Sequence, residues 1–504
     1  MSAVAVDAPV GAGTGARGSS NGALLALARF EARRLLTRVP VVVAFVAYAA
    51  WIVWHTPGSW DGHPALQEAD RDTQAMPMLV GLAVLVSVNF AALRPVRHGT
   101  EQHLGVLAMP AWRRTAAHAL SVVPAALLTA VCVGGQFTWE ALKPGAVGHG
   151  SPAELAAGPL VVLAAGTIGV LVASLVRSPV AAPLLVVPLL YLLVLGSGSG
   201  GADGVSWLAP VVVQSGGDAL PSGLLGRPAA WHALYLAGIA LCAAFLALLR
   251  AGGRNVAVRT GVALTLALAV AGGVLQARGA QPSPELTAAR ERAVSDPALR
   301  CTERGRSTYC AFPEWAPRVG VWAGVVDRVQ ALAGGTARER RLVVGQRIGA
   351  ADLVSDAAVP PRSEPGRVTV GTAWGGNRVP EFSSAVAAVL VTGSEKAGGE
   401  LCDGRMVTLM WLSLSWQDDP MDALRRVRLD DSVSGSAIVL SPTEPLSMTE
   451  GQTDVVRRLL EKPAGGTGER VKAHWDELTE PGVTTARAAE LLGVAGPGEA
   501  DSCE

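Results

Sequence analysis

Seven long apolar runs between residues 39 and 277 constrain this chain more than any other feature of its sequence. A helix needs about 20 apolar residues to cross the roughly 30 Å hydrocarbon layer of a bilayer, and each run has or approaches that length. None of the runs contains Asp, Glu, Lys or Arg. They predict an α-helical polytopic membrane protein, with about seven transmembrane helices at 39–54, 76–93, 116–138, 155–176, 179–197, 229–249 and 260–277.

The sequence changes character after residue 278, where the apolar runs stop and Arg, Asp and Glu become frequent. We therefore expect a transmembrane domain over 39–278 and a separate aqueous domain over 279–504, mostly helical but of mixed α+β type. Residues 1–22 are rich in Gly, Ala and Ser and are predicted to be a disordered tail. The formal net charge is zero, so nothing indicates a nucleic-acid partner.

Residues 23–38 read as an amphipathic, basic helix that lies in the cytoplasmic interface before the first span. Its Leu24, Leu27, Leu35 and Leu36 are expected to face inward, with the Arg side chains at lipid phosphates.

Basic residues alternate between the two sides of the predicted spans. Thirteen fall on one side (Arg17, Arg29, Arg33, Arg34, Arg38, Arg94, Arg97, Arg113, Arg114, Arg177, Arg250, Arg254 and Arg259) and three on the other (Arg71, Lys143 and Arg227). Because positive loops stay in the cytoplasm during insertion, the N-terminus is predicted to be cytoplasmic. Seven crossings of the plasma membrane would then place the 279–504 domain outside the cell.

The cysteines provide an independent prediction of compartment. Cys301 and Cys310 bracket the polar stretch CTERGRSTYC, which resembles a hairpin closed by a disulfide, although two free thiols are the alternative. Such a bond forms in oxidising compartments, and closing a loop of this length stabilises by about 3 kcal/mol in the chain-entropy model. A bond between Cys402 and Cys503 is a further possibility. No Cys or His spacing indicates a metal site.

The predicted spans lack the ionisable groups that proton- and ion-coupled transporters use at membrane depth. Their main polar side chains are expected to form interhelical hydrogen bonds or interfacial anchors; they are Asn89, Gln136, Gln276, His118 and His232. The chain also has no GxxxxGK[ST] phosphate loop, so it cannot hydrolyse ATP in the manner of a P-loop enzyme.

Three cytoplasmic features together resemble the membrane subunit of a type-2 ABC exporter. They are the pre-helix segment RFEARRLLTRVP, the loop HGTEQHLGVLAMPAWRRTAAHAL, and the hairpin GTIGVLVASLVRSPVAAPLL. Such permeases have an E-x-R-R-L-L-x-R-x-P-like elbow and a Gly-Thr-Glu-led coupling segment between their second and third spans. The resemblance covers about 24–277. This chain departs from the family pattern of six spans by having a seventh, followed by a large outer domain.

The resemblance implies a non-catalytic subunit that holds no cofactor itself, with ATP and magnesium bound by a separate ATP-binding subunit. It also implies a second permease subunit, identical or different, that completes the path through the bilayer. The segment that would contact the ATP-binding subunit is Thr100–Pro110, with Thr100, Glu101, Leu104, Leu107, Met109 and Pro110 as its candidate residues. On spacing alone the same segment also fits a plain solvated loop.

The 279–504 domain has no recognisable catalytic motif. Helices are expected at 284–300, 381–393, 405–416 and 453–461, and strands at 341–348 and 367–372. The order His-Trp-Asp-Glu at 474–477 is not HExxH, and GxSxG is absent. GTAWGGNRVPEF (371–382) is interpreted as a turn, and GGTG (465–468) as a flexible linker. The alternative to a permease is therefore a membrane-anchored extracytoplasmic binding or sensor protein; an enzyme is a weaker third possibility.

Overall fold

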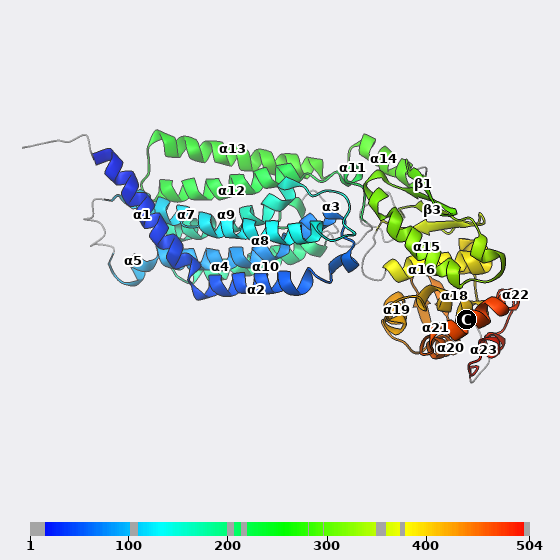
Figure 1. The fold of residues 1–504 in the computed structure, drawn as a ribbon. Coiled ribbons are helices and arrows are strands. Elements are labelled where there is room, and N and C mark those ends of the chain that lie inside the picture. Colours follow the sequence, from blue (N-terminus) through cyan, green and yellow to red (C-terminus); the bar gives the residue numbers. More distant parts are fainter. Residues whose placement is uncertain are drawn as a thin grey trace, which may run out of the picture.

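The computed structural model describes residues 16–100, 109–198, 206–212, 219–280, 282–295, 297–348, 359–372 and 378–497. Its N-terminal half forms a bundle of long helices, and its C-terminal half forms a domain at one end of that bundle (Figure 1). The first helix lies at the opposite end (Figure 1). The two ends are called the basic end, where the first helix lies, and the domain end.

The long helices of the bundle are α1 (Ala16–Leu36), α2 (Val39–His55), α4 (Ala75–Ala92), α7 (Ala111–Leu120), α8 (Val123–Ala141), α9 (Pro152–Leu175), α10 (Ala181–Gly198), α12 (Ala229–Arg250) and α13 (Val256–Gly279). Short helical segments join them: η1 (Ser59–Gly62), α3 (Leu66–Asp72), α5 (Arg94–Arg97), η2 (Ser206–Leu208) and α11 (Ser222–Leu225).

Within the described residues, five helices are long and apolar enough to cross a membrane, and a sixth is added if one bent pair counts as a single span. The five are Leu66–Ala92, Ala111–Ala141, Pro152–Leu175, Ala229–Arg250 and Val256–Ser295. The bent pair is Asn21–Leu36 with Val39–His55, at 62°. The prediction of a multi-pass helical membrane protein is confirmed, whereas the count of seven stays a prediction.

The boundary predicted for the N-terminal tail is wrong, because residues 16–22 of the predicted 1–22 tail are helical, as part of α1. The span predicted at 116–138 lies within the apolar helix Ala111–Ala141, which is interrupted at Ser121–Val122 between α7 and α8. Pro124 explains this break, because its ring lacks an N–H and would clash with a helical carbonyl four residues earlier.

Four of the five predicted polar residues of the spans make interhelical hydrogen bonds. Asn89 of α4 donates to the Gly169 carbonyl of α9 at 3.1 Å. The Tyr48 hydroxyl of α2 donates to Gln136 of α8 at 3.3 Å, and His232 of α12 lies 3.1 Å from Gln276 of α13. These pairs satisfy polar groups where lipid offers no partner.

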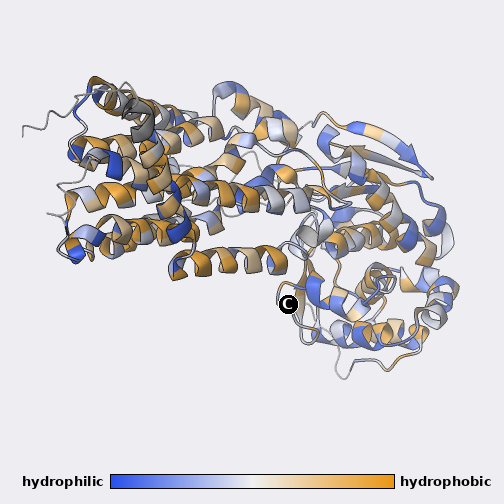
Figure 2. Cartoon of the chain, turned by 60° about the vertical axis from the view of Figure 1, so that its left-hand side comes forward, coloured by the Kyte–Doolittle hydropathy of each residue, from blue (hydrophilic) through white to orange (hydrophobic). Residues whose placement is uncertain are grey.

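The outward faces of the bundle helices are apolar. Exposed side chains include Val43 and Val46 of α2, Leu127 and Val131 of α8, and Leu264 of α13. Hydrophobic residues predominate along the bundle, whereas hydrophilic residues are frequent on the C-terminal domain (Figure 2). Apolar surface of this extent is typical of a protein that faces lipid.

Helices α4 and α9 approach closely at Gly169. A Cβ placed there would lie 2.5 Å from the Leu85 carbonyl oxygen of α4, which is closer than real Cβ contacts. Small residues at such crossings let two backbones pack directly, and this contact also brings Asn89 within reach of its acceptor.

The C-terminal domain comprises α14 (Pro284–Ser295), β1 (Arg300–Arg304), β2 (Ser307–Ala311), η3 (Pro313–Arg318), α15 (Val319–Leu332), η4 (Gly335–Glu339), β3 (Val343–Gln346), β4 (Arg367–Val370), α16 (Arg378–Thr392), α17 (Glu395–Gly399), α18 (Arg405–Leu414), α19 (Pro420–Val427), β5 (Ala437–Val439), β6 (Leu446–Met448), α20 (Glu450–Leu460), α21 (Ala464–Ala473), α22 (Trp475–Leu478) and α23 (Thr485–Leu492). The helices and strands expected from the sequence are present with shifted ends, but the helix expected over 284–300 ends at Ser295, and Arg300 instead begins β1.

One sheet of this domain has the order β1-β2-β3-β4, with β1 and β2 antiparallel and the other neighbours parallel. Cys301 and Cys310 face each other in the β1–β2 hairpin and are joined by the expected disulfide. Cys402 is also disulfide-bonded, and Cys503 lies outside the described residues. Cys132 and Cys242, within the bundle, are free.

The flexible linker predicted at 465–468 is wrong, because these residues lie inside α21. Thr467 and Gly468 are buried, and a Cβ at Gly468 would lie 3.4 Å from the Trp411 ring. Packing of α21 against this tryptophan therefore outweighs the low helix propensity of glycine. The turn predicted at 371–382 lies partly outside the described residues, and its last residues belong to α16.

We expect Gly169→Val to separate α4 from α9, because its side chain would overlap the Leu85 carbonyl. Overpacking of this kind costs about 1–3 kcal/mol. Thermal melting of the detergent-solubilised chain, followed by size-exclusion chromatography, should show a lower midpoint. Gly134→Val is the matched control, since a Cβ at Gly134 meets nothing within 4 Å. Equal midpoints for the two variants would contradict the close crossing.

Candidate functional site

The segment predicted to contact an ATP-binding subunit lies at the basic end of the bundle, between α5 and α7. Thr100, Met109 and Pro110 are described, whereas Glu101, Leu104 and Leu107 lie outside the described residues. The structure therefore describes the two flanks of the segment, whereas its centre lies outside the described residues.

Both flanks are held by local hydrogen bonds. On the first, Gly99 has a φ of 65°, and the Thr100 amide donates to the Pro95 carbonyl at 2.9 Å, which ends α5. On the second, Pro110 precedes the first residue of α7, and Arg114 donates to the Met109 carbonyl at 2.8 Å. The chain thus enters and leaves the 101–108 stretch from two anchored helix ends.

An ion pair ties the first flank to α1. Arg94 of α5 donates to both carboxylate oxygens of Glu31, at 3.1 and 3.3 Å, and the Glu31 side chain is 7% exposed. A bidentate pair fixes orientation as well as distance. Glu31 is the Glu of the elbow-like motif, but its partner lies 63 residues away, so sequence reasoning had assigned it no role.

Helix α1 packs along α7 as well as against α4. Its inward face contains Leu24, Leu27, Leu35 and Leu36, as expected, together with the buried Ala28. The Arg34 guanidinium lies over the exposed Phe30 ring at 5.3 Å. Both flanks of the 101–108 stretch therefore connect to α1, one through Arg94 and the other through α7.

At the domain end, three arginine or carboxylate contacts join the C-terminal domain to the bundle. Arg318 of η3 donates to the carbonyls of Gly145 and His63 at 3.0 and 2.5 Å. The Glu314 carboxylate accepts from the Ser222 amide and hydroxyl, and Arg290 donates to the Leu224 and Leu225 carbonyls. Sequence reasoning missed these contacts, because each joins residues far apart in the chain.

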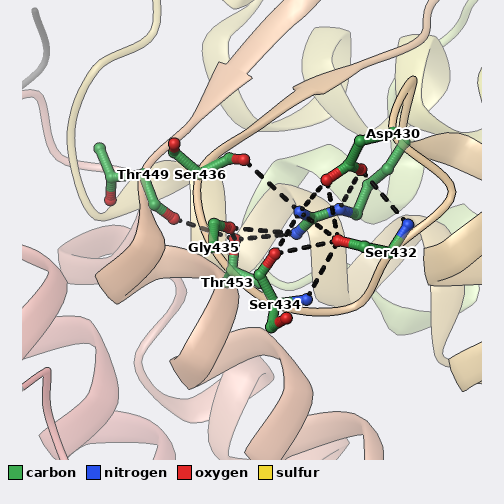
Figure 3. Close-up of polar contacts among 8 residues, drawn as sticks. Asp430, Ser432, Ser434, Gly435, Ser436, Thr449 and Thr453 are labelled. Atoms are coloured by element: carbon green, nitrogen blue, oxygen red, sulfur yellow. Dashed lines mark hydrogen bonds and ion pairs between the residues drawn. The ribbon is translucent and has the colours of Figure 1, made fainter.

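Polar groups surround the buried guanidinium of Arg428, as they would surround a bound ligand; Asp430, Ser432 and Thr453 are among the residues labelled in Figure 3. The guanidinium donates to both carboxylate oxygens of Asp430 at 3.0 Å, to the Thr453 hydroxyl at 3.2 Å, and to the Ser434 carbonyl at 2.7 Å. These hydrogen bonds hold the pKa of Asp430 well below its usual range. The N–H groups of Arg428 are hydrogen-bonded mainly to the 430–436 loop. The cluster is therefore interpreted as structural.

The His-Trp-Asp-Glu stretch at 474–477 leads from α21 into α22. His474 lies at the junction of α21 and α22, and Glu477 pairs with Arg487 at 2.6 Å on the exposed surface. Across the described residues, no group of three His, Cys, Asp or Glu side chains is arranged to hold a metal ion.

No protein-family model, curated protein or solved structure matches this chain.

We expect Arg428→Lys to destabilise the C-terminal domain by about 2–3 kcal/mol, because an ammonium cannot reproduce the planar set of hydrogen bonds. The melting midpoint should fall by about 4–12 °C for a domain of this size. Arg425→Lys is the control, since Arg425 is half exposed and its ion pair is with the surface Asp422. A midpoint for Arg428→Lys equal to that of the control would show that the cluster does not stabilise the domain.

Proposed function

We propose that this chain is the membrane subunit of an ABC exporter, moving substrate outward with ATP that a separate subunit hydrolyses. The observation that carries the proposal is the anchoring of both flanks of the 101–108 stretch to α1 at the basic end. Force applied to that stretch would pass through rigid contacts into the bundle. This is the mechanical arrangement that a coupling segment requires.

Three further features support the proposal. The elbow-like and Gly-Thr-Glu-led motifs occur in the expected order relative to the helices, one at α1–α2 and the other between α4 and α7. The central parts of the bundle helices contain no charged residue, which disfavours an ion-coupled mechanism. The positive-inside pattern favours a cytoplasmic location for the basic end, where ATP is available.

In this proposal, closure of the ATP-binding subunits around nucleotide displaces Thr100–Pro110. The Glu31–Arg94 ion pair transmits the displacement to α1, and α7 transmits it to α8. A second permease subunit, a copy of this chain or a related one, completes the path. The C-terminal domain lies on the outer side, where the Cys301–Cys310 disulfide is stable.

A membrane-anchored extracytoplasmic binding or sensor protein is the second candidate. The extensive docking of the C-terminal domain on the domain end favours it, because ligand binding outside would then be sensed by the bundle. It does not account for the anchored flanks at the basic end.

Affinity purification of the tagged full chain from its native membranes tests the proposal. We expect a P-loop ATPase to co-purify in stoichiometric amounts and to be lost when residues 100–110 are scrambled. Scrambling residues 2–10, which are predicted to lie in the same compartment, should leave the ATPase bound. Purification of the chain without an ATPase, in mild detergent with nucleotide present, would favour the anchored binding protein.

Replacement of Glu101 with Lys should uncouple ATP hydrolysis from the membrane subunit while leaving insertion unchanged. We expect the ATPase activity of the purified complex in nanodiscs to fall by about tenfold, within the usual range of coupling free energies. Glu285→Lys is the control, because Glu285 is exposed on α14 of the C-terminal domain. Wild-type activity in Glu101→Lys would show that this residue does not take part in coupling.

A further inference from the structure

A cavity of about 490 Å³ lies at the domain end of the bundle. Its walls come from α3, the 149–151 loop, the start of α9, and α11 with the residues leading into α12. The volume falls within the 300–1,000 Å³ of ordinary small-molecule sites. No catalytic or coupling residue considered above lines it.

Two buried carboxylates line this cavity, and each has one oxygen without a hydrogen-bond partner. Asp70 is 1% exposed; its Oδ2 accepts from the Ser151 amide at 2.8 Å, and its Oδ1 has no partner within the described part of the protein. Glu154 is 4% exposed; its Oε2 accepts from the Gln74 amide, and its Oε1 is likewise without a partner there. A buried acceptor left unpaired costs about 1–3 kcal/mol, and more when it is charged.

The arginine side chains nearby already donate hydrogen bonds to other groups. Arg227, which also lines the cavity, donates to both carboxylate oxygens of Glu68 at 2.7 and 2.6 Å and to the Gln67 carbonyl at 2.6 Å. Arg71 donates to the Val212 carbonyl at 3.1 Å. Neither guanidinium has a hydrogen bond to Asp70 Oδ1 or Glu154 Oε1, so both oxygens are without a donor among the described residues.

The remaining wall indicates what kind of ligand would fit. Leu225, Ala229 and Pro152 add apolar surface beside the carboxylates, which suits an alkyl chain attached to a charged group. Among the described residues, no three His, Cys, Asp or Glu side chains of this wall are arranged to hold a metal ion. An ammonium group has three N–H donors and forms strong, charge-assisted hydrogen bonds with carboxylates.

We propose that this cavity binds a small organic cation, with its ammonium group held between Asp70 and Glu154. The C-terminal domain takes part indirectly, because Glu314 and Arg290 hold the α11 segment that forms one wall. Binding would then fasten the domain to the bundle. The inference does not depend on export, since an exporter and an anchored binding protein could both use such a site.

The test is equilibrium binding of dansylcadaverine, a fluorescent primary amine, to the full chain in phosphatidylcholine nanodiscs. We expect saturable enhancement of dansyl emission that pentylamine reverses and pentanol does not. Asp70→Asn and Glu154→Gln should each weaken binding by at least about tenfold, the usual effect of losing one charge-assisted hydrogen bond. Asp72→Asn, two residues from Asp70 but exposed and not in the cavity wall, should stay within about twofold of wild type.

Three results would overturn the proposal. They are emission that does not saturate, wild-type affinity in both Asp70→Asn and Glu154→Gln, and displacement of the probe by millimolar Ca²⁺ in an Asp70-dependent manner, which would indicate a metal site instead. Glu154→Gln decides the matter if Asp70→Asn does not yield folded protein. Because no ATP-binding subunit is present, failure here is distinct from failure of the export proposal.

Discussion

The buried guanidinium of Arg318 is a central contact between the helix bundle and the C-terminal domain. It is 1% exposed and donates to carbonyls of two loops at the domain end of the bundle. Burial lowers its pKa to about 9, because the charged form loses water that protein carbonyls only partly replace. A charge is retained at such a position only when its hydrogen bonds compensate for desolvation, so both loops must keep their conformation.

Hydrophobic packing extends this junction. The core of the C-terminal domain is continuous with Ala65, Val147 and Leu220 at the domain end, and includes the fully buried Trp315 and Trp322. Because the core is shared, a conformational change in the C-terminal domain would alter the loops and short helices that end the bundle, and the reverse also holds. The cavity lined by Asp70 and Glu154 lies among these same elements, which places a ligand site where the two parts already meet.

The bundle itself is built with little polar content at membrane depth. Its interhelical hydrogen bonds give buried polar side chains a partner where lipid offers none, as in the pair of His232 and Gln276. Charged side chains instead gather at the two ends, with Glu31 and Arg94 at one and Glu68 and Arg227 at the other. A bundle of this type suits a mechanism in which energy arrives from outside the membrane, as in the proposed exporter.

The sequence alone determined the features that depend on near neighbours. Uninterrupted apolar runs located the bundle helices, alternating basic loops predicted their orientation, and the spacing of Cys301 and Cys310 predicted a closed hairpin. Local patterns also located the main strands and helices of the C-terminal domain, but they misread 465–468, where burial against Trp411 makes a glycine-rich stretch helical. Only the tertiary structure paired Glu31 with Arg94, docked Arg318 on the bundle, and brought Asp70 and Glu154 to one cavity. These contacts join residues tens to hundreds of positions apart, and such pairing is decided by how the helices pack, which no local period in the sequence encodes.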